Sequence, residues 1–279
     1  MRLEYLVDVE EISIKEYLML LGLSRRLARK IKLYGKMYIN HQEAFNYHLV
    51  KKGDLLTIEF DETLNQEIVA NPSELEIFYN DDDLMVVNKP HDLAIQPSRR
   101  HQEDNLISRI KAFFIDQEIT SNIHIVNRLD YATSGLVLVA KNGYIHHQLT
   151  SKNRINKKYQ ALVTGKLLEK EGTIDLPIAR LIDGEIKRGV SETGKTAITN
   201  YKVLVEYENT SLLELILETG RTHQIRVHLS HIGHPLVGDK LYGTEEKRLY
   251  LDCYYMEFIH PQTKKKLIFM LQDLKFHKN

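Results

Sequence analysis

The sequence predicts an α+β fold with a largely antiparallel sheet. Strand-like segments outnumber helical ones, and the two kinds do not alternate strictly, as they would around a parallel sheet. The chain has 279 residues, enough for a large domain together with a small one. Hydrophobic residues make up 43% of it and charged residues 27%, a balance that allows a buried core to form.

Composition excludes several classes of protein. The formal net charge is zero, so binding to a nucleic acid must rest on local basic patches. The single cysteine, Cys253, excludes a disulfide framework and a zinc site built from cysteines. The N-terminus lacks the apolar core of a signal peptide, and no apolar run approaches the ~18 residues of a membrane span. We therefore expect a cytoplasmic protein, a monomer by default, without membrane association.

Residues 1–62 have the pattern of a small α/β unit. Apolar residues at Ile14, Tyr17, Leu18 and Leu21 follow helical spacing, and Gly22 ends that helix. Strands are expected over 37–39 and 55–60.

A second helix follows Ser24, which is placed to cap it. Its apolar face is predicted to consist of Leu27, Ile31 and Tyr34. The opposite face is basic and consists of Arg25, Arg26, Arg29, Lys30, Lys32 and, just beyond, Lys36. Such a face can lie along phosphates, although a charge run is more often a solvated surface.

Residues 63–74 contain Pro72 and little periodicity, so we predict a linker there and a second domain over 75–279. Strands are expected in that domain at 74–79, 84–88, 136–140, 159–164, 199–207, 211–218 and 267–271. Helices are expected at 104–115, 143–151 and 222–232.

The most informative segment carries Arg128 and Asp130 in a polar loop, followed by the turn 133–135 and an apolar strand. A fold places a carboxylate beside a cleft in this way, on a loop that a rigid strand supports. On the residues alone an equal alternative stands: Asp130 caps the turn and Arg128 is its solvated neighbour.

Residues 127–141 resemble the catalytic motif of the RluA family of pseudouridine synthases, H-R-L-D-x-x-T-S-G-L-L-L-x-A-K. Two positions differ, with Asn127 in place of His and Val137 in place of Leu. Four other blocks resemble the family in the same order, at 77–98, 158–165, 220–239 and 260–263. Other departures are His91-Asp92, in place of a small residue and Gly, and 251–253, in place of Leu-His-Ala.

The resemblance implies a pseudouridine synthase fold, with a mainly antiparallel mixed sheet flanked by helices. It implies that Asp130 is the catalytic carboxylate and that Tyr159 stacks on the base and serves in proton transfer. It further implies that Arg221 pairs with Asp130, and that Arg128 enters the RNA stack when the uridine is flipped out. The resemblance also implies a reaction that needs no cofactor, redox centre, metal or ATP.

The N-terminal unit more loosely resembles the small RNA-binding domain named after ribosomal small-subunit protein four (the alpha-L motif). The resemblance rests on 24–26, the helix that follows, 35–40 and Gly53-Asp54. A further basic stretch could extend the track for phosphates before Tyr159: Lys152, Arg154, Lys157 and Lys158.

Histidines crowd 223–234, and His228 and His231 could share a helix face and bind a metal. We expect none, because nearby acids are few and Arg221, Arg226 and Lys240 would repel a cation.

The leading hypothesis is an enzyme that isomerises uridine in large-subunit ribosomal RNA, with transfer RNA as the next substrate. A second hypothesis is a non-catalytic RNA-binding or ribosome-assembly protein on the same scaffold. The presence of Asp130, Tyr159 and Arg221 together argues against it. A third, a nucleosidase, would usually need a second carboxylate, and none stands at an obvious position in these blocks.

Overall fold

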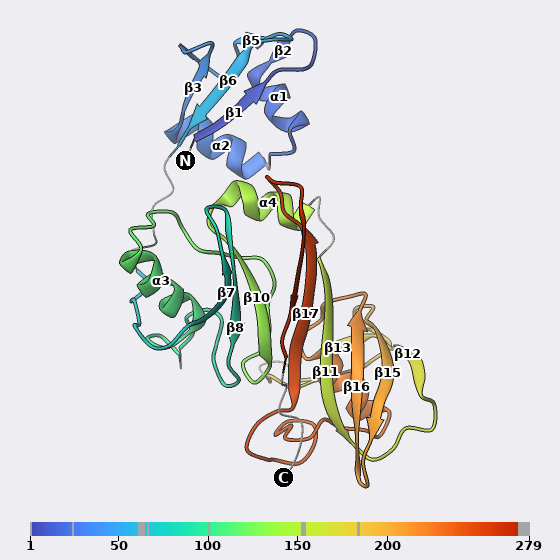
Figure 1. Cartoon of the computed structure of the whole chain (residues 1–279). Coiled ribbons are helices and arrows are strands. Elements are labelled where there is room, and N and C mark those ends of the chain that lie inside the picture. The colour runs from blue at the N-terminus through green and yellow to red at the C-terminus, as the bar shows by residue number, and fades with distance from the viewer. Residues whose placement is uncertain are drawn as a thin grey trace.

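A computed structural model describes residues 2–23, 25–60, 65, 67–99, 101–151, 155–182 and 185–272, without the side chain of Arg26. It has a small N-terminal unit and a larger domain built on one long sheet (Figure 1). Over these residues, every helix is too short or too polar to cross a bilayer.

The N-terminal unit is a four-stranded antiparallel sheet in the order β1-β6-β3-β4, with two helices packed on it. Its strands are β1 (Arg2–Leu6), β3 (Lys36–Ile39), β4 (Gln42–Ala44) and β6 (Leu55–Glu59), and a separate pair is formed by β2 (Ile12–Ser13) and β5 (Leu49–Val50). Ser13 and Glu16 form a capping box at the start of α1 (Ile14–Leu20). Both predicted helices and both predicted strands are confirmed.

Helix α2 (Arg25–Tyr34) buries only part of its predicted apolar face. Leu27 and Ile31 are buried in the core of the unit. Tyr34 was predicted to join them, but it is 76% exposed, so that part of the prediction was wrong. The helix ends at Tyr34, and the chain continues through Gly35 into β3. The capping residue proposed for α2, Ser24, lies outside the described residues.

The large domain is built on a ten-stranded sheet whose main order is β12-β15-β16-β11-β17-β10-β8-β7. Every pairing is antiparallel except that of β10 with β17, which confirms the predicted mixed sheet. The strands named so far are β7 (Glu76–Asn80), β8 (Leu84–Lys89), β10 (Ser134–Ala140), β11 (Asn156–Thr164), β12 (Glu171–Asp175), β15 (Ile198–Glu206), β16 (Thr210–Leu217) and β17 (Leu251–Ile259). Two short strands lie off this path, β9 (His124–Ile125) on β10 and β18 (Lys266–Met270) on β17.

Strand β17 occupies the middle of the sheet, between β10 and β11. The sequence did not predict it, because polar and apolar residues do not alternate over 251–259. Asp252 and Cys253 are both buried there. Their neighbours across the parallel pairing are Ser134 and Gly135, the first residues of β10.

In the described part of the large domain, the helices that cover the sheet are α3 (Leu106–Asp116), α4 (Gly143–Ser151) and α5 (Gln224–His231). Helix α4 lies between the sheet and the N-terminal unit (Figure 1). Its Tyr144 packs against the core of each, with its ring 6.5 Å from that of Tyr5. Gln148 Nε2 also donates to the Leu21 carbonyl at 3.4 Å. The two units therefore meet through α4.

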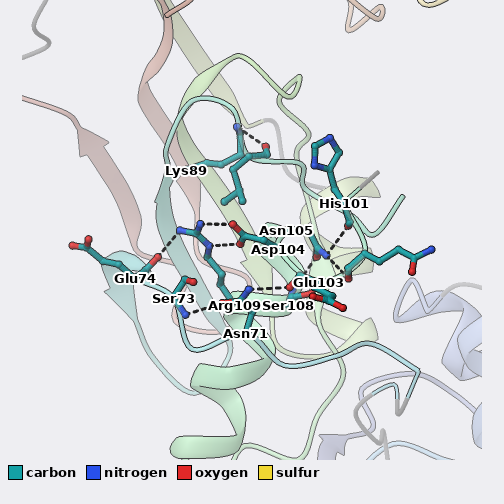
Figure 2. A network of polar contacts seen from close by, with 12 residues as sticks. Asn71, Ser73, Glu74, Lys89, His101, Glu103, Asp104, Asn105, Ser108 and Arg109 are labelled. Atoms are coloured by element: carbon teal, nitrogen blue, oxygen red, sulfur yellow. Dashed lines mark hydrogen bonds and ion pairs between the residues drawn. The ribbon is translucent and has the colours of Figure 1, made fainter. Parts of the chain in front are cut away.

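The described part of the predicted linker is hydrogen-bonded to α3 and to the segment just before it. Lys111 Nζ donates to the carbonyl oxygens of Asn65 and Ile68 at 2.8 and 2.6 Å. Figure 2 shows the next contacts: Asn71 Nδ2 donates to the Glu103 carbonyl, and Arg109 donates to the Glu74 carbonyl. These contacts fix where the chain enters β7.

Candidate active site

A cleft of about 1130 Å³ opens where β10, β11 and the start of α5 approach one another. It collects residues that lie far apart in the sequence and that the sequence singled out: Arg128, Asp130, Lys158, Tyr159 and Arg221. The loop before β10 carries the first two, β11 the next two, and the segment before α5 the last. The structure therefore brings these five residues together in one cleft.

The loop around Asp130 is fixed at both ends. The side chain of Asn127 receives the Leu138 N–H at 2.7 Å and donates to the Leu136 carbonyl at 3.2 Å, which ties the loop to β10. Asn127 thus has a structural role, which agrees with its lack of a titratable ring. The Thr133 N–H donates to the Asp130 carbonyl at 3.1 Å and closes the turn.

Gly135 cannot be replaced without moving the backbone of β17. Its φ is +114°, and a Cβ there would lie 2.3 Å from the carbonyl oxygen of Cys253. This close approach explains the glycine in the Thr-Ser-Gly turn.

Lys89 supports the loop that carries Asp130, and the sequence did not single this lysine out. The side chain is fully buried, and its ammonium donates to the carbonyl oxygens of Pro90, Leu93 and Tyr131 at 2.8, 2.9 and 3.1 Å. Tyr131 directly follows Asp130. Burial lowers the pKa of Lys89 to about 7, against the opposing charges of Asp92, Asp130 and Asp252.

The hydroxyl of Tyr159 is protonated at neutral pH. The residue is 6% exposed, and burial raises its pKa well above the usual value, with smaller contributions from Cys253 and Asp130. A protonated phenol donates a hydrogen bond and offers a ring face. To act as a base it would first have to pass its proton to another group.

The carboxylate of Asp130 is half-buried, and no hydrogen bond or ion pair to it forms among the described residues. The predicted pairing with Arg221 is therefore not formed in this structure. Instead the exposed Arg221 donates from Nε to the Thr196 carbonyl at 2.9 Å.

The buried arginine of the cleft is Arg226. Its guanidinium forms two hydrogen bonds with the carboxylate of Asp239, at 2.8 and 2.7 Å. Burial alone would lower the pKa of Arg226, but Asp239 and, more weakly, Asp130 raise it. The charge of Asp130 thus acts on Arg226. The two arginines stand in the same sequence block, and only their burial tells them apart.

His223 precedes α5 and also lines the cleft. Its backbone is left-handed (φ +58°), an unusual conformation for a residue other than glycine. Burial lowers the pKa of its ring, with Asp130 opposing, so the ring is neutral at pH 7. Its Nδ1 is hydrogen-bonded to the Tyr242 hydroxyl at 2.9 Å.

The remaining basic residues lie in different settings. Lys158 is paired with Glu214 at 3.3 Å, so a bound phosphate would compete with that carboxylate. On α2, Arg25 and Arg29 are exposed and Lys30 is half-buried. The side chain of Arg26 and both Lys152 and Arg154 lie outside the described part of the structure.

Two of the crowded histidines, His228 and His234, are hydrogen-bonded to protein groups. His228 Nε2 donates to the Leu176 carbonyl at 2.9 Å, and Nδ1 is bonded to the Thr199 hydroxyl. His234 Nδ1 donates to the Thr164 carbonyl at 2.9 Å. Within the described ranges, no three His, Cys, Asp or Glu side chains gather closely enough to hold a metal.

Known proteins place this chain in a family. Residues 83–231 match the model of the RNA pseudouridylate synthase family. The chain is 38% identical over 266 residues to an uncharacterised RNA pseudouridine synthase of Bacillus subtilis, YjbO, covering 92% of this chain and 94% of that one. It is also 38% identical over 198 residues to ribosomal large subunit pseudouridine synthase D of Pseudomonas aeruginosa, covering 70% of this chain and 62% of that one.

The fold agrees with a solved structure of this kind. Human RNA pseudouridylate synthase domain containing 1 superposes with a TM-score of 0.61 and 28% identity, covering 73% of this chain and 85% of that chain. Together with the sequence matches, this places the chain in the RNA pseudouridylate synthase family as an isomerase of the RluA-like kind.

Proposed function

We propose that this cleft isomerises uridine to pseudouridine in a folded RNA, with Asp130 acting on the sugar. The observation that carries the proposal is the carboxylate of Asp130, which faces a cleft lined by Tyr159 and Arg221. No hydrogen bond among the described residues occupies it, so it is available to a substrate.

The chemistry assigns one role to each side chain. The target nucleotide is flipped out of the RNA and enters the cleft, with Arg128 taking its place in the stack. Asp130 either adds to C1′ or stabilises the positive charge that develops on the sugar as the C1′–N1 bond breaks. The uracil anion rotates on the ring of Tyr159 and bonds to C1′ through C5, which breaks any bond between Asp130 and C1′. C5 then loses its proton to water and N1 gains one, which restores the aromatic base.

The other carboxylates of the cleft support isomerisation over hydrolysis. A hydrolase would need an acid placed to position water. Glu218 accepts a hydrogen bond from Asn200 at 3.0 Å, and Glu257 accepts one from Tyr255 at 2.7 Å and pairs with Lys266 at 3.0 Å. Both are engaged by protein groups.

Large-subunit ribosomal RNA is the proposed substrate, and transfer RNA is the alternative. The similarity to relatives named as ribosomal large subunit synthases supports the first. The N-terminal unit, which we propose to be an RNA-binding domain, would hold the RNA through Arg25, Arg26, Arg29 and Lys30. We further propose that the protein acts as a cytoplasmic monomer.

The test uses cellular RNA labelled with tritium at uridine C5. We expect the wild type to release tritium to water and Asp130→Asn to release none while still binding RNA. Asp116→Asn is the matched control, because Asp116 is an exposed aspartate at the end of α3. Fractionated RNA would then separate ribosomal from transfer substrates. Equal release by wild type and Asp130→Asn would overturn the role of Asp130. No release by the wild type, with RNA still bound, would favour a binding protein.

A further inference from the structure

A second hollow of about 540 Å³ adjoins the catalytic cleft. It is formed by the antiparallel hairpin of β13 (Ile178–Arg180) and β14 (Arg188–Val190), together with residues 193–195. Residues 220–222 line both hollows. An RNA strand that leaves the catalytic cleft could therefore continue across the hairpin.

Among the described residues, the lining of this hollow contains cations and no acid. Its charged side chains are Arg180, Arg188, Lys195 and Arg221, which we call the hairpin cation cluster. None of the four forms an ion pair with any described residue. Hydroxyl groups of Thr193 and Thr222 complete the polar lining.

The positions of two arginines require an explanation. Arg180 and Arg188 stand directly opposite each other in the register of β13 and β14. Like charges at such positions repel and destabilise a strand pair. In addition, Nη1 of Arg188 is buried and has no hydrogen-bond partner in the described structure. A buried charged donor left unpaired is costly, so both features favour a bound anion that neutralises the pair.

The cluster is held rigidly against the active site. Ile178 and Lys195 exchange two backbone hydrogen bonds, each 2.9 Å long. The Arg188 N–H donates to the Tyr242 hydroxyl at 2.7 Å, and that hydroxyl is also bonded to His223 in the catalytic cleft. The Tyr242 phenol therefore connects the hairpin to His223, the residue that precedes α5.

Arg221 joins the two hollows. Its Nε is used by the Thr196 carbonyl, which leaves the two terminal amino groups for a ligand. Arginine forks match the oxygen geometry of a phosphate and bind it with two hydrogen bonds. This placement suits a phosphate better than it suits the pairing with Asp130 that the sequence implied.

We propose that the hairpin cation cluster binds the RNA backbone, taking the phosphates next to the nucleotide that enters the catalytic cleft. This inference rests on the proposed function, because the phosphates belong to the same RNA whose uridine enters the cleft. The cluster positions the RNA and does not touch the reacting atoms. It gives affinity without reading sequence, as phosphate contacts do.

The test compares Arg180→Gln/Arg188→Gln with the control Lys166→Gln/Lys265→Gln. The control removes two exposed lysines that line neither hollow and form no ion pair among the described residues. RNA binding is measured in an Asp130→Asn background, at several salt concentrations. We expect the arginine variant to bind roughly tenfold more weakly at ~0.1 M salt and to lose about one to two units of the log–log salt slope. The control should lose much less of both.

The same arginine change in the otherwise unaltered enzyme should raise KM for RNA and leave kcat unchanged. Equal affinity and equal salt slope for the arginine and control variants would overturn the inference, even if the wild type releases tritium. If the wild type releases no tritium but the arginine variant still binds RNA more weakly, the proposed reaction is overturned. The hairpin cation cluster then remains supported as an RNA-binding surface. Because the change removes a repulsive pair, we expect no drop in Tm. If the double variant unfolds, Lys195→Gln alone supplies the binding test.

Discussion

Arg226 and Asp239 form a two-bonded ion pair in which both side chains are buried. The same carboxylate also accepts the N–H groups of Leu241 and Tyr242, at 2.9 and 3.1 Å. Arg226 lines the cleft, whereas Asp239 does not. The pair thus joins a residue that lines the cleft to the loop that follows α5.

Breaking this pair should destabilise the protein strongly. Asp239→Asn leaves the Arg226 charge buried without its partner, at a cost of about 3–5 kcal/mol in the free energy of unfolding. Urea unfolding would measure it as a lower midpoint with an unchanged slope. Asp116→Asn should leave the midpoint in place. A midpoint for Asp239→Asn equal to that of wild type would contradict the prediction.

The same pair predicts a dependence of stability on pH. Burial alone would raise the pKa of Asp239, but the hydrogen bonds and charge of Arg226 lower it. Its contribution is therefore present above the unfolded pKa of about 4 and is lost as pH falls through the lower folded pKa. The stability difference between wild type and Asp239→Asn should shrink in that acid range. A difference that stays constant down to pH 2 would argue against the pair as its source.

Lys89 should make the protein more stable in alkali. Its folded pKa of about 7 lies below the unfolded value near 10.4. Between these values the unfolded chain binds more protons, so stability rises with pH. Lys89→Met removes that rise, and comparison of the two proteins across pH 7–10 isolates it from other groups. Parallel stability curves for the two proteins would exclude a neutral lysine in the folded state.

Lys89→Met should also lower turnover, because the Tyr131 carbonyl next to Asp130 loses its donor. We expect kcat to fall roughly tenfold at an unchanged KM, as for the loss of about 1.4 kcal/mol in the transition state. Tritium release at saturating RNA measures this. A change in KM alone would indicate a role in binding instead.

Tyr159→Phe should separate the ring of Tyr159 from its hydroxyl. We expect RNA affinity to stay within about twofold and kcat to fall roughly tenfold or more, since phenylalanine cannot donate the hydrogen bond that the phenol could give in the transition state. The raised pKa keeps the phenol protonated, so the wild-type rate should show no inflection from this group over pH 6–9. An inflection in that range that disappears in Tyr159→Phe would show that the phenol ionises.

The basic face of α2 should contribute to binding and not to turnover. Arg25→Gln/Arg29→Gln removes two exposed charges, and we expect KM for structured RNA to rise several-fold, the salt slope to fall by about two units and kcat to hold. Lys51→Gln/Lys52→Gln changes the same number of charges in the turn before β6 and serves as the control. Equal effects of the two double variants would mean that α2 has no special role.

Local sequence patterns predicted those helices and strands in which apolar residues recur with one clear period or which a strong turn signal bounds. Helix α1 and the strand pair β15 and β16 are confirmed. Strand β17 was missed because its two faces are both covered and its buried positions include Asp252, so neither alternation nor an apolar run marks it. Tyr34 was placed in the core because periodicity does not reveal where a helix leaves the sheet.

The candidate site was predictable to the extent that it lies in contiguous blocks. Asp130, Tyr159 and Arg221 line one cleft, and the roles that the resemblance implied for them stay predictions. The partner of the buried carboxylate Asp239 could not be read from sequence. Arg221 precedes α5 and is exposed, whereas Arg226 lies within it and points inward. Lys89 was missed because its partners are backbone carbonyls, which every sequence supplies.

The parallel pairing of β10 with β17 sets an order on folding. Ser134, at the foot of the Asp130 loop, is hydrogen-bonded to Asp252, which lies 118 residues later in the chain. A contact this distant closes late, since local hairpins form before long loops. During synthesis the loop cannot acquire its final support until β17 has left the ribosome and entered the middle of the sheet. A nascent chain that lacks residues 251–259 therefore lacks the support that Ser134 receives from Asp252.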